Sequence, residues 1–169
     1  MSWTLFARVF RRRTPAAKPS SILEKPSGEK DLAGVLEAEE GVVEVPPYSN
    51  WGKRVGEYLA STGITYPQPW CAAFVHWGMA QIGQKGYGAY CPSWFIPMYE
   101  IDAPVRNAWG LVYFPKMQRY AHIFVVTKIC GNGMIETIEG NTNNDGGREG
   151  TGVFRRLRDP RAHRFFIRR

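Results

Sequence analysis

The sequence predicts an α+β fold in which helices come first along the chain and strands follow. Stretches in the first half place apolar residues at helical spacing, and short strand-like stretches separated by turns follow Asn107. A hairpin signal, Gly-Asn-Gly at residues 131–133, joins two of the strand-like stretches. Helices followed by a run of strands are typical of α+β proteins with an antiparallel sheet.

The composition limits the class of protein before any motif is considered. The chain has 169 residues, 44% hydrophobic and 14% aromatic, which is enough for one domain with its own core and too much for a wholly disordered chain. No apolar run approaches the roughly 18 residues of a membrane-spanning helix. Three irregularly spaced cysteines fit neither a disulfide framework nor a zinc site, and no Gly-rich phosphate loop follows a strand. We therefore expect no metal and no cofactor.

The net charge of +7 is concentrated at the two ends of the chain. Residues 1–13 carry four arginines and no acid, and residues 155–169 carry seven arginines and one aspartate. The middle of the chain is left with a net charge of −3. Such ends can bind an anionic surface, or they can be solvated arginines beside a last strand.

The first thirty residues have the composition of a basic segment and a linker. Residues 1–13 place three aromatic side chains near one another on a short amphipathic helix, and prolines are spaced through residues 14–30. The charge follows a very short apolar stretch, the reverse of the order in a secretory signal. We therefore expect residues 1–30 to be an appendage without a signal peptide and residues 31–169 to form the domain.

Two short helices are expected at the start of this domain. Asp31 provides an N-cap for the first helix, which ends by Gly41. Ser49 or Asn50 caps the second helix, whose apolar residues fall at helical spacing before Gly63.

The third helix, residues 69–83, is apolar almost all round, as is typical of a buried helix. Pro69 suits its approach and Gly83 suits its C-cap. Cys71 therefore stands at or near the N-terminus of this helix. Unpaired N–H groups and the positive end of the helix dipole favour a thiolate there, as in a cysteine nucleophile. The alternative is a small core cysteine.

The segment after this helix, residues 86–105, is aromatic and irregular. Cys91 lies here, directly before a proline that can open a short helix, so it is a rival nucleophile. Trp94 belongs to the same segment. It is a candidate for substrate binding as a wall of the groove, and it suits the core equally well.

Five segments after Asn107 have strand character. They are residues 109–114, 122–129, 134–139, 152–157 and 163–167. Residues 140–151 form a long polar loop between the third and the fourth. We expect the strands to form an antiparallel meander.

A thiol nucleophile needs a histidine to accept its proton and a third group to orient that imidazole. His76 lies on the same helix as Cys71 but roughly 140° round from it, so the two cannot pair. His122 opens an apolar strand, where a polar group needs a reason; it is a catalytic base or a satisfied edge histidine. The hairpin brings the start of this strand beside the end of the next, where alternation puts Glu139 and Asn141 on one face.

The order cysteine, histidine, then acid or amide, with the cysteine on a helix and the others on a sheet, is the papain-like arrangement. Three motifs carry it: Trp-Cys-Ala-Ala-Phe (70–74), Ala-His-Ile (121–123) and Ile-Glu-Gly-Asn-Thr (138–142). In this order they resemble the CHAP domain, a family of cysteine, histidine-dependent amidohydrolases/peptidases related to NlpC-type wall peptidases. The resemblance runs from about residue 37 to residue 158. The family usually has glycine where this chain has Ala121, and often has Gly-Asp where this chain has Gly110 and Leu111.

The resemblance implies a hydrolase that cleaves an amide bond in the peptide part of bacterial peptidoglycan. Such enzymes are N-acetylmuramoyl-L-alanine amidases or endopeptidases and occur as phage endolysins, autolysins and toxins. The resemblance implies Cys71 as the nucleophile, His122 as the base, and Glu139 and Asn141 as orienting partners. Gln68 is a candidate second oxyanion donor beside the backbone N–H of Cys71.

We therefore predict peptidoglycan as the partner, with no nucleic acid, and a monomeric protein. The arginine-rich ends are candidates for contact with an anionic envelope surface. The enzyme would be made in the cytoplasm and act on the wall after release or delivery. Two other functions remain open. One is a papain-like protease or transferase that acts on proteins, since this chemistry is not specific for one bond, and the other is a catalytically silent wall-binding module.

Overall fold

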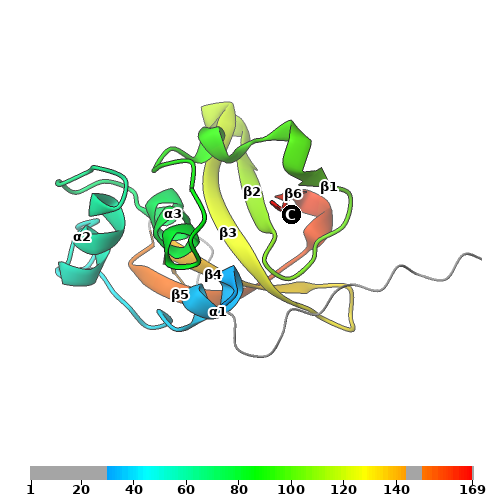
Figure 1. The fold of residues 1–169 in the computed structure, drawn as a ribbon, viewed down its shortest axis with the longest axis horizontal. Coiled ribbons are helices and arrows are strands. Elements are labelled where there is room, and N and C mark those ends of the chain that lie inside the picture. Colours follow the sequence, from blue (N-terminus) through cyan, green and yellow to red (C-terminus); the bar gives the residue numbers. More distant parts are fainter. Residues whose placement is uncertain (1–29, 144–149, 169) are drawn as a thin grey trace, which may run out of the picture.

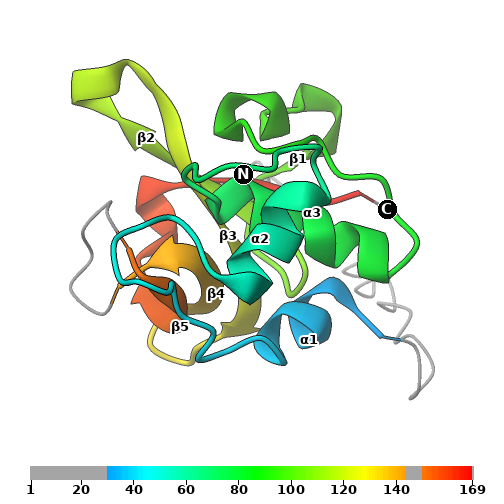
Figure 2. The same ribbon diagram turned by 90° about the vertical axis from the view of Figure 1, so that its left-hand side faces the viewer.

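Helices cover one side of a six-stranded antiparallel sheet in the computed structural model of the protein, which describes residues 30–143 and 150–168 (Figures 1 and 2). The helices are α1 (Leu32–Glu37), α2 (Lys53–Ala60) and α3 (Cys71–Gln81). The strands are β1 (Glu100–Ile101), β2 (Trp109–Phe114), β3 (Arg119–Ile129), β4 (Ile135–Thr142), β5 (Gly152–Arg158) and β6 (Arg164–Phe166). The predicted α+β class is confirmed. None of the described helices is long and apolar enough to cross a membrane. The predicted basic segment and linker lie, except for Lys30, outside the described residues.

The two short helices start differently from one another. Asp31 caps α1 as predicted, because its side chain accepts a hydrogen bond from the Gly34 N–H at 2.7 Å, a type of contact that contributes about 1 kcal/mol. The predicted cap of α2 is wrong, since the N-cap residue is Gly52 and no side chain caps the helix. Ser49 and Asn50 instead belong to the turn that precedes Gly52, where Asn50 has a φ of 52°.

Helix α3 is buried along most of its length, as its apolar sequence predicts. It packs on β3 and β4 and ends before Gly83, which has a φ of 70°. The close approach to β4 depends on Gly140, because a Cβ at that position would lie 2.7 Å from the Trp70 ring and 2.8 Å from the Phe74 ring. A glycine in β4 therefore lets the N-terminus of α3 rest directly on the strand.

The sheet has the strand order β1-β6-β2-β3-β4-β5. Strands β2 to β5 form the predicted meander, but β6 returns to pair with β2, so the sheet as a whole is not a simple meander. Strand β6 returns to this position because its apolar side chains are buried there, where Phe166 stacks on Trp109 in the core. Two strands are longer than predicted. β3 begins at Arg119, and β4 continues to Thr142, through the first residues of the predicted polar loop.

Strand β3 is the centre of the domain because both of its faces are covered. Ile123 and Val125 belong to the main core beneath the helices. Phe124 and Val126 belong to a second cluster on the opposite face of the sheet. Alternate residues of one strand therefore fill two cores, which accounts for its unbroken apolar sequence. His122 therefore lies directly before a run of strand residues that are buried on both faces of the sheet.

Candidate active site

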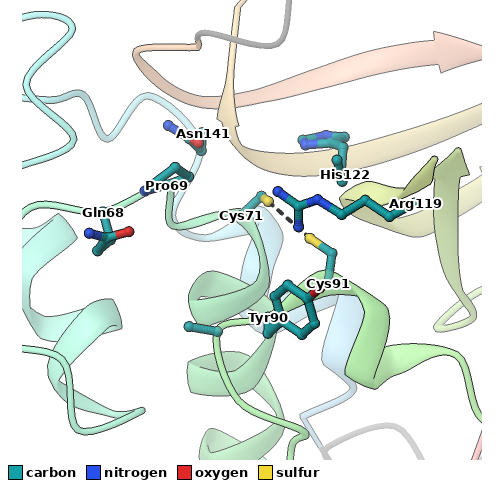
Figure 3. A pocket seen from close by; sticks show the side chains of 10 residues that line it. Gln68, Pro69, Cys71, Tyr90, Cys91, Arg119, His122 and Asn141 are labelled. Atoms are coloured by element: carbon teal, nitrogen blue, oxygen red, sulfur yellow. Dashed lines mark hydrogen bonds between the residues drawn. The ribbon is translucent and has the colours of Figure 1, made fainter. Parts of the chain in front are cut away.

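An open pocket of about 670 Å³ lies where the N-terminus of α3 meets β3 and β4 (Figure 3). Its lining is Gln68, Pro69, Cys71, Ala89, Tyr90, Cys91, Arg119, Ala121, His122 and Asn141. Four of the residues predicted from the sequence thus come together here, although they are spread over more than seventy positions of the chain. A fifth, Glu139, lies behind His122 and is fully buried.

The pocket contains a chain of contacts from a thiol to a carboxylate. Cys71 is the first residue of α3 and has 5% of its surface exposed. The Nε2 atom of His122 lies 2.7 Å from Oε2 of Glu139. This contact leaves the other ring nitrogen, Nδ1, for Cys71, and each of these two residues shifts the pKa of the other. The hairpin pairing that the sequence predicts is what brings His122 to Glu139.

Glu139 is fixed by more than the histidine. Arg158 of β5 grips the carboxylate with two nitrogens, Nε at 2.5 Å and an Nη at 2.6 Å, and the Thr137 hydroxyl donates a further hydrogen bond at 2.6 Å. Burial alone would raise the pKa of Glu139, but the hydrogen bonds and charges of Arg158 and His122 outweigh it and lower the pKa well below its usual range. The carboxylate therefore stays ionised and can only accept hydrogen bonds.

The pKa values of the histidine and the cysteine shift in opposite directions. Burial alone would lower the pKa of His122, but hydrogen bonds to Cys71 and Glu139, together with their charges, raise it to about 9. The pKa of the Cys71 thiol lies well below its ordinary value, chiefly because of a hydrogen bond with Cys91. Burial opposes this shift, while the hydrogen bond and charge of His122 add to it. The pocket therefore favours a thiolate beside an imidazolium at neutral pH.

Cys91 is placed as a hydrogen-bond partner of Cys71, whereas from the sequence it was considered as a rival nucleophile. Its Sγ lies 3.4 Å from Sγ of Cys71, at the start of the 3-10 turn Cys91–Trp94. The pKa of Cys91 is raised well above its ordinary value, first by the hydrogen bond with Cys71 and then by burial. Cys91 therefore stays protonated and donates its S–H to the Cys71 thiolate. The contact joins residues twenty positions apart, and no sequence pattern predicts it.

We expect replacement of the Cys91 donor to change the reactivity of Cys71. Cys91→Ala removes the hydrogen bond, so the pH at which Cys71 reacts half-maximally with iodoacetamide should rise. Cys91→Ser keeps a donor and should retain most of the hydrolytic activity. The alkylated residue is identified by peptide mass mapping. An identical pH profile for wild type and Cys91→Ala would contradict the assigned hydrogen bond.

Asn141 lines the pocket but makes its hydrogen bonds elsewhere. Its Nδ2 lies within 3.2 Å of acceptors on Glu44, Asn50 and Gly150. The regular alternation of β4 ends here, since Asn141 has a φ of 53° and the pairing with β5 shifts between Glu139 and Thr142. The expectation that Glu139 and Asn141 share a face by simple alternation is therefore wrong. Of the two, Glu139 is the one that contacts the imidazole.

Glu44 is a buried carboxylate that no motif singles out. Its Oε1 accepts a hydrogen bond from the Trp70 indole at 2.8 Å, and Asn141 lies at 3.2 Å from the same atom. The backbone N–H of Asn50 donates to its other oxygen at 3.0 Å. Glu44 thus ties the residue before Cys71 to the end of β4.

Trp94 does not form a wall of the pocket, and that prediction is corrected. The side chain is fully buried, its indole donates to the Gly88 carbonyl at 3.0 Å, and its ring packs against Tyr87 and Trp109. The alternative considered from the sequence, a core residue, is what the structure contains. The aromatic side chain that lines the pocket is Tyr90.

His76 is remote from this site, as predicted. Its Nδ1 accepts a hydrogen bond from the Gly88 N–H at 2.9 Å, and burial lowers its pKa, so it is a neutral structural residue. Within residues 30–143 and 150–168, no group of three or more His, Cys, Asp or Glu side chains is arranged so that it could hold a metal ion.

Comparison with known proteins finds similarity among solved structures. No protein-family model and no curated protein sequence matches the chain, so the resemblance to CHAP domains stays a prediction. Among solved structures, an N-acetylmuramoyl-L-alanine amidase from Staphylococcus aureus is similar over 62% of this chain, with 21% sequence identity and a TM-score of 0.45. The match spans 32% of the length of that amidase.

Proposed function

We propose that the protein is a cysteine hydrolase that cleaves an amide bond in the peptide part of bacterial peptidoglycan. The observation that supports the chemistry best is the contact of His122 with the buried carboxylate of Glu139, in the pocket that His122 lines together with Cys71. The substrate class rests on the motifs around these residues, which resemble those of CHAP domains.

In the first step of the proposed reaction the Cys71 thiolate attacks the carbonyl carbon of the amide. The Cys71 backbone N–H is free to stabilise the developing oxyanion, because the first N–H groups of a helix have no partner within it. Gln68 is exposed, lines the same pocket and is the candidate second donor. The His122 imidazolium then gives its proton to the leaving amine, which departs and leaves a thioester on Cys71.

In the second step water hydrolyses the thioester. The imidazole of His122, now neutral, takes a proton from the attacking water, and the acid product leaves as Cys71 is released as a thiolate. Glu139 holds the Nε2–H of the ring, so that Nδ1 is the nitrogen that exchanges protons at the sulfur. Because Arg158 fixes the carboxylate, the imidazole keeps this orientation through both steps.

The decisive experiment follows the clearing of a suspension of purified cell walls and then identifies the soluble fragments by mass spectrometry. Release of free stem peptides would indicate an amidase, and cleavage within the peptides an endopeptidase. Casein serves as the second substrate. Cleavage of casein but not of walls would favour the protein-directed protease. Binding to walls without any cleavage would favour the silent module, and both results would overturn the proposal.

A comparison of Glu139 with Asn141 tests which residue orients the imidazole. Glu139→Gln removes the charge that helps to raise the pKa of His122, so we expect that pKa to fall and kcat/KM to drop by about 100-fold. Asn141→Ala should lose far less, because its hydrogen bonds go to other partners. Rates are measured at several pH values and per folded molecule. Full activity in Glu139→Gln with an inactive Asn141→Ala would assign the role to the asparagine.

The basic N-terminal segment is tested by deletion of residues 1–30. The C-terminal arginines suit such a test less well, since many make internal contacts, among them Arg155, Arg158, Arg161 and Arg164 with carboxylates. If the segment draws the enzyme to an anionic envelope, the deletion should weaken binding to whole walls at low salt. Cleavage of a small soluble muropeptide should be unchanged. Wall binding that is indifferent to both salt and the deletion would contradict the electrostatic role.

A further inference from the structure

Arg119 is a cationic residue of the pocket that the proposed reaction does not use. It is the first residue of β3 and lines the pocket together with Cys71 and His122. In Figure 3 its side chain reaches across the pocket toward the two cysteine sulfurs, from the side opposite Gln68 and Pro69. The positive charge of Arg119 acts on Cys91, because it lowers the pKa of this thiol and so opposes the overall rise in that pKa.

The guanidinium of Arg119 has no carboxylate to neutralise it within residues 30–143 and 150–168. Its Cζ lies 5.4 Å from the centre of the Tyr90 ring, which supports the group from one face and leaves its N–H edge open. Other arginines of the domain are paired with carboxylates, namely Arg54, Arg106, Arg155, Arg158, Arg161 and Arg164. Among the described residues Arg156 and Arg168 also lack a carboxylate partner, but they hydrogen-bond to other oxygens and do not line the pocket, as Arg119 does.

The reacting groups balance one another's charges without Arg119. The thiolate of Cys71 is balanced by the imidazolium of His122, and the groups that lower the pKa of Cys71 are Cys91, His122 and the Ile123 backbone. No residue that lines the pocket is acidic. Among the residues that line the pocket, Arg119 therefore carries a charge that no other lining residue balances.

We propose that Arg119 is a specificity residue that binds a carboxylate of the substrate beside the scissile amide. A guanidinium matches a carboxylate with two parallel hydrogen bonds, and this pairing is strongest in a pocket from which water is partly excluded. On this basis the enzyme selects peptides that carry a free carboxylate next to the bond it cleaves, over the same peptides with that group amidated. The proposal rests on the proposed peptide hydrolysis, but the anion site itself can be tested without any wall substrate.

The first test compares two reagents of nearly the same shape that alkylate Cys71, anionic iodoacetate and neutral iodoacetamide. Arg119→Gln should lower the ratio of the iodoacetate rate to the iodoacetamide rate about fivefold or more, because only the anion gains from the guanidinium. The iodoacetamide rate reports whether the thiolate and the fold are intact. Arg119→Lys should keep part of the ratio. Arg161→Gln is the matched control, since it removes a charge from an outer surface where the side chain is 88% exposed, and should leave the ratio unchanged.

The second test uses a soluble muropeptide with a free carboxylate next to the scissile bond and its amidated counterpart. Wild type should cleave the acid about tenfold better in kcat/KM, mainly through KM, and Arg119→Gln should lose that preference. A preference that survives in Arg119→Gln, or an alkylation ratio that does not change, would overturn the proposal while wall hydrolysis stands. If wild type cleaves neither peptide but the ratio falls in Arg119→Gln, the proposed function fails and the anion site remains.

Discussion

We expect the Cys71→Ser variant to lose wall hydrolysis almost completely, by a factor of about 10⁴ or more in kcat/KM. The proposed reaction begins from a thiolate that Cys91 and His122 stabilise before any substrate binds. A serine hydroxyl at the same position is not ionised near neutral pH, so the attack lacks the preformed anion that Cys71 provides. The measurement is the rate of wall clearing, together with the rate on a soluble muropeptide.

The control for this substitution is another cysteine. Cys130 lies in the turn between β3 and β4, away from the pocket, and Cys130→Ser should keep nearly all of the activity. Thermal unfolding of the two variants checks that neither has lost the fold. Activity retained by Cys71→Ser would remove the nucleophile from the proposed mechanism and with it the thiol chemistry.

The parts of the fold that could be predicted are those with local signals. The Asp31 cap, the buried helix α3 and the hairpin after β3 each depend on residues close together in the sequence. The second helix cap could not be predicted in the same way, because Asn50 takes part in long-range contacts with Glu44 and Asn141 that fix the turn before the helix. Tertiary contacts there outweigh the local preference for a polar cap.

In the candidate site, too, the residues with local signals could be predicted and those that depend on long-range contacts could not. His122 and Glu139 could be placed together because one hairpin joins their strands. Arg158 could not be anticipated, since its grip on Glu139 depends on the pairing of β4 with β5 across a long connection. Cys91 comes from an irregular segment without periodicity, and Arg119 is the first residue of a strand, so neither position in the pocket could be predicted from a local pattern. The contacts that tune the site were therefore missed, although Cys91 itself was considered as a rival nucleophile.

We expect His122→Ala to be as inactive as Cys71→Ser, because the leaving amine then has no proton donor and the thiolate loses its counterion. The fold should survive this change. Glu139 keeps Arg158 and Thr137 as partners, so no buried charge is left without a counterpart. Full wall hydrolysis by His122→Ala would contradict the assignment of the base.

The pH dependence separates loss of the base from loss of the fold. The pKa of His122 is raised from 6.5 to about 9, so in wild type the imidazolium persists to about pH 9 and is lost as the pH rises through that value. Activity should therefore fall on the alkaline side near pH 9. In His122→Ala the pKa of Cys71 should rise, since the histidine charge that lowers it is gone, and alkylation by iodoacetamide at pH 7 should slow. At a pH high enough to ionise the thiol, alkylation of the variant should again match wild type while hydrolysis stays absent, because a thiolate alone cannot protonate the leaving amine.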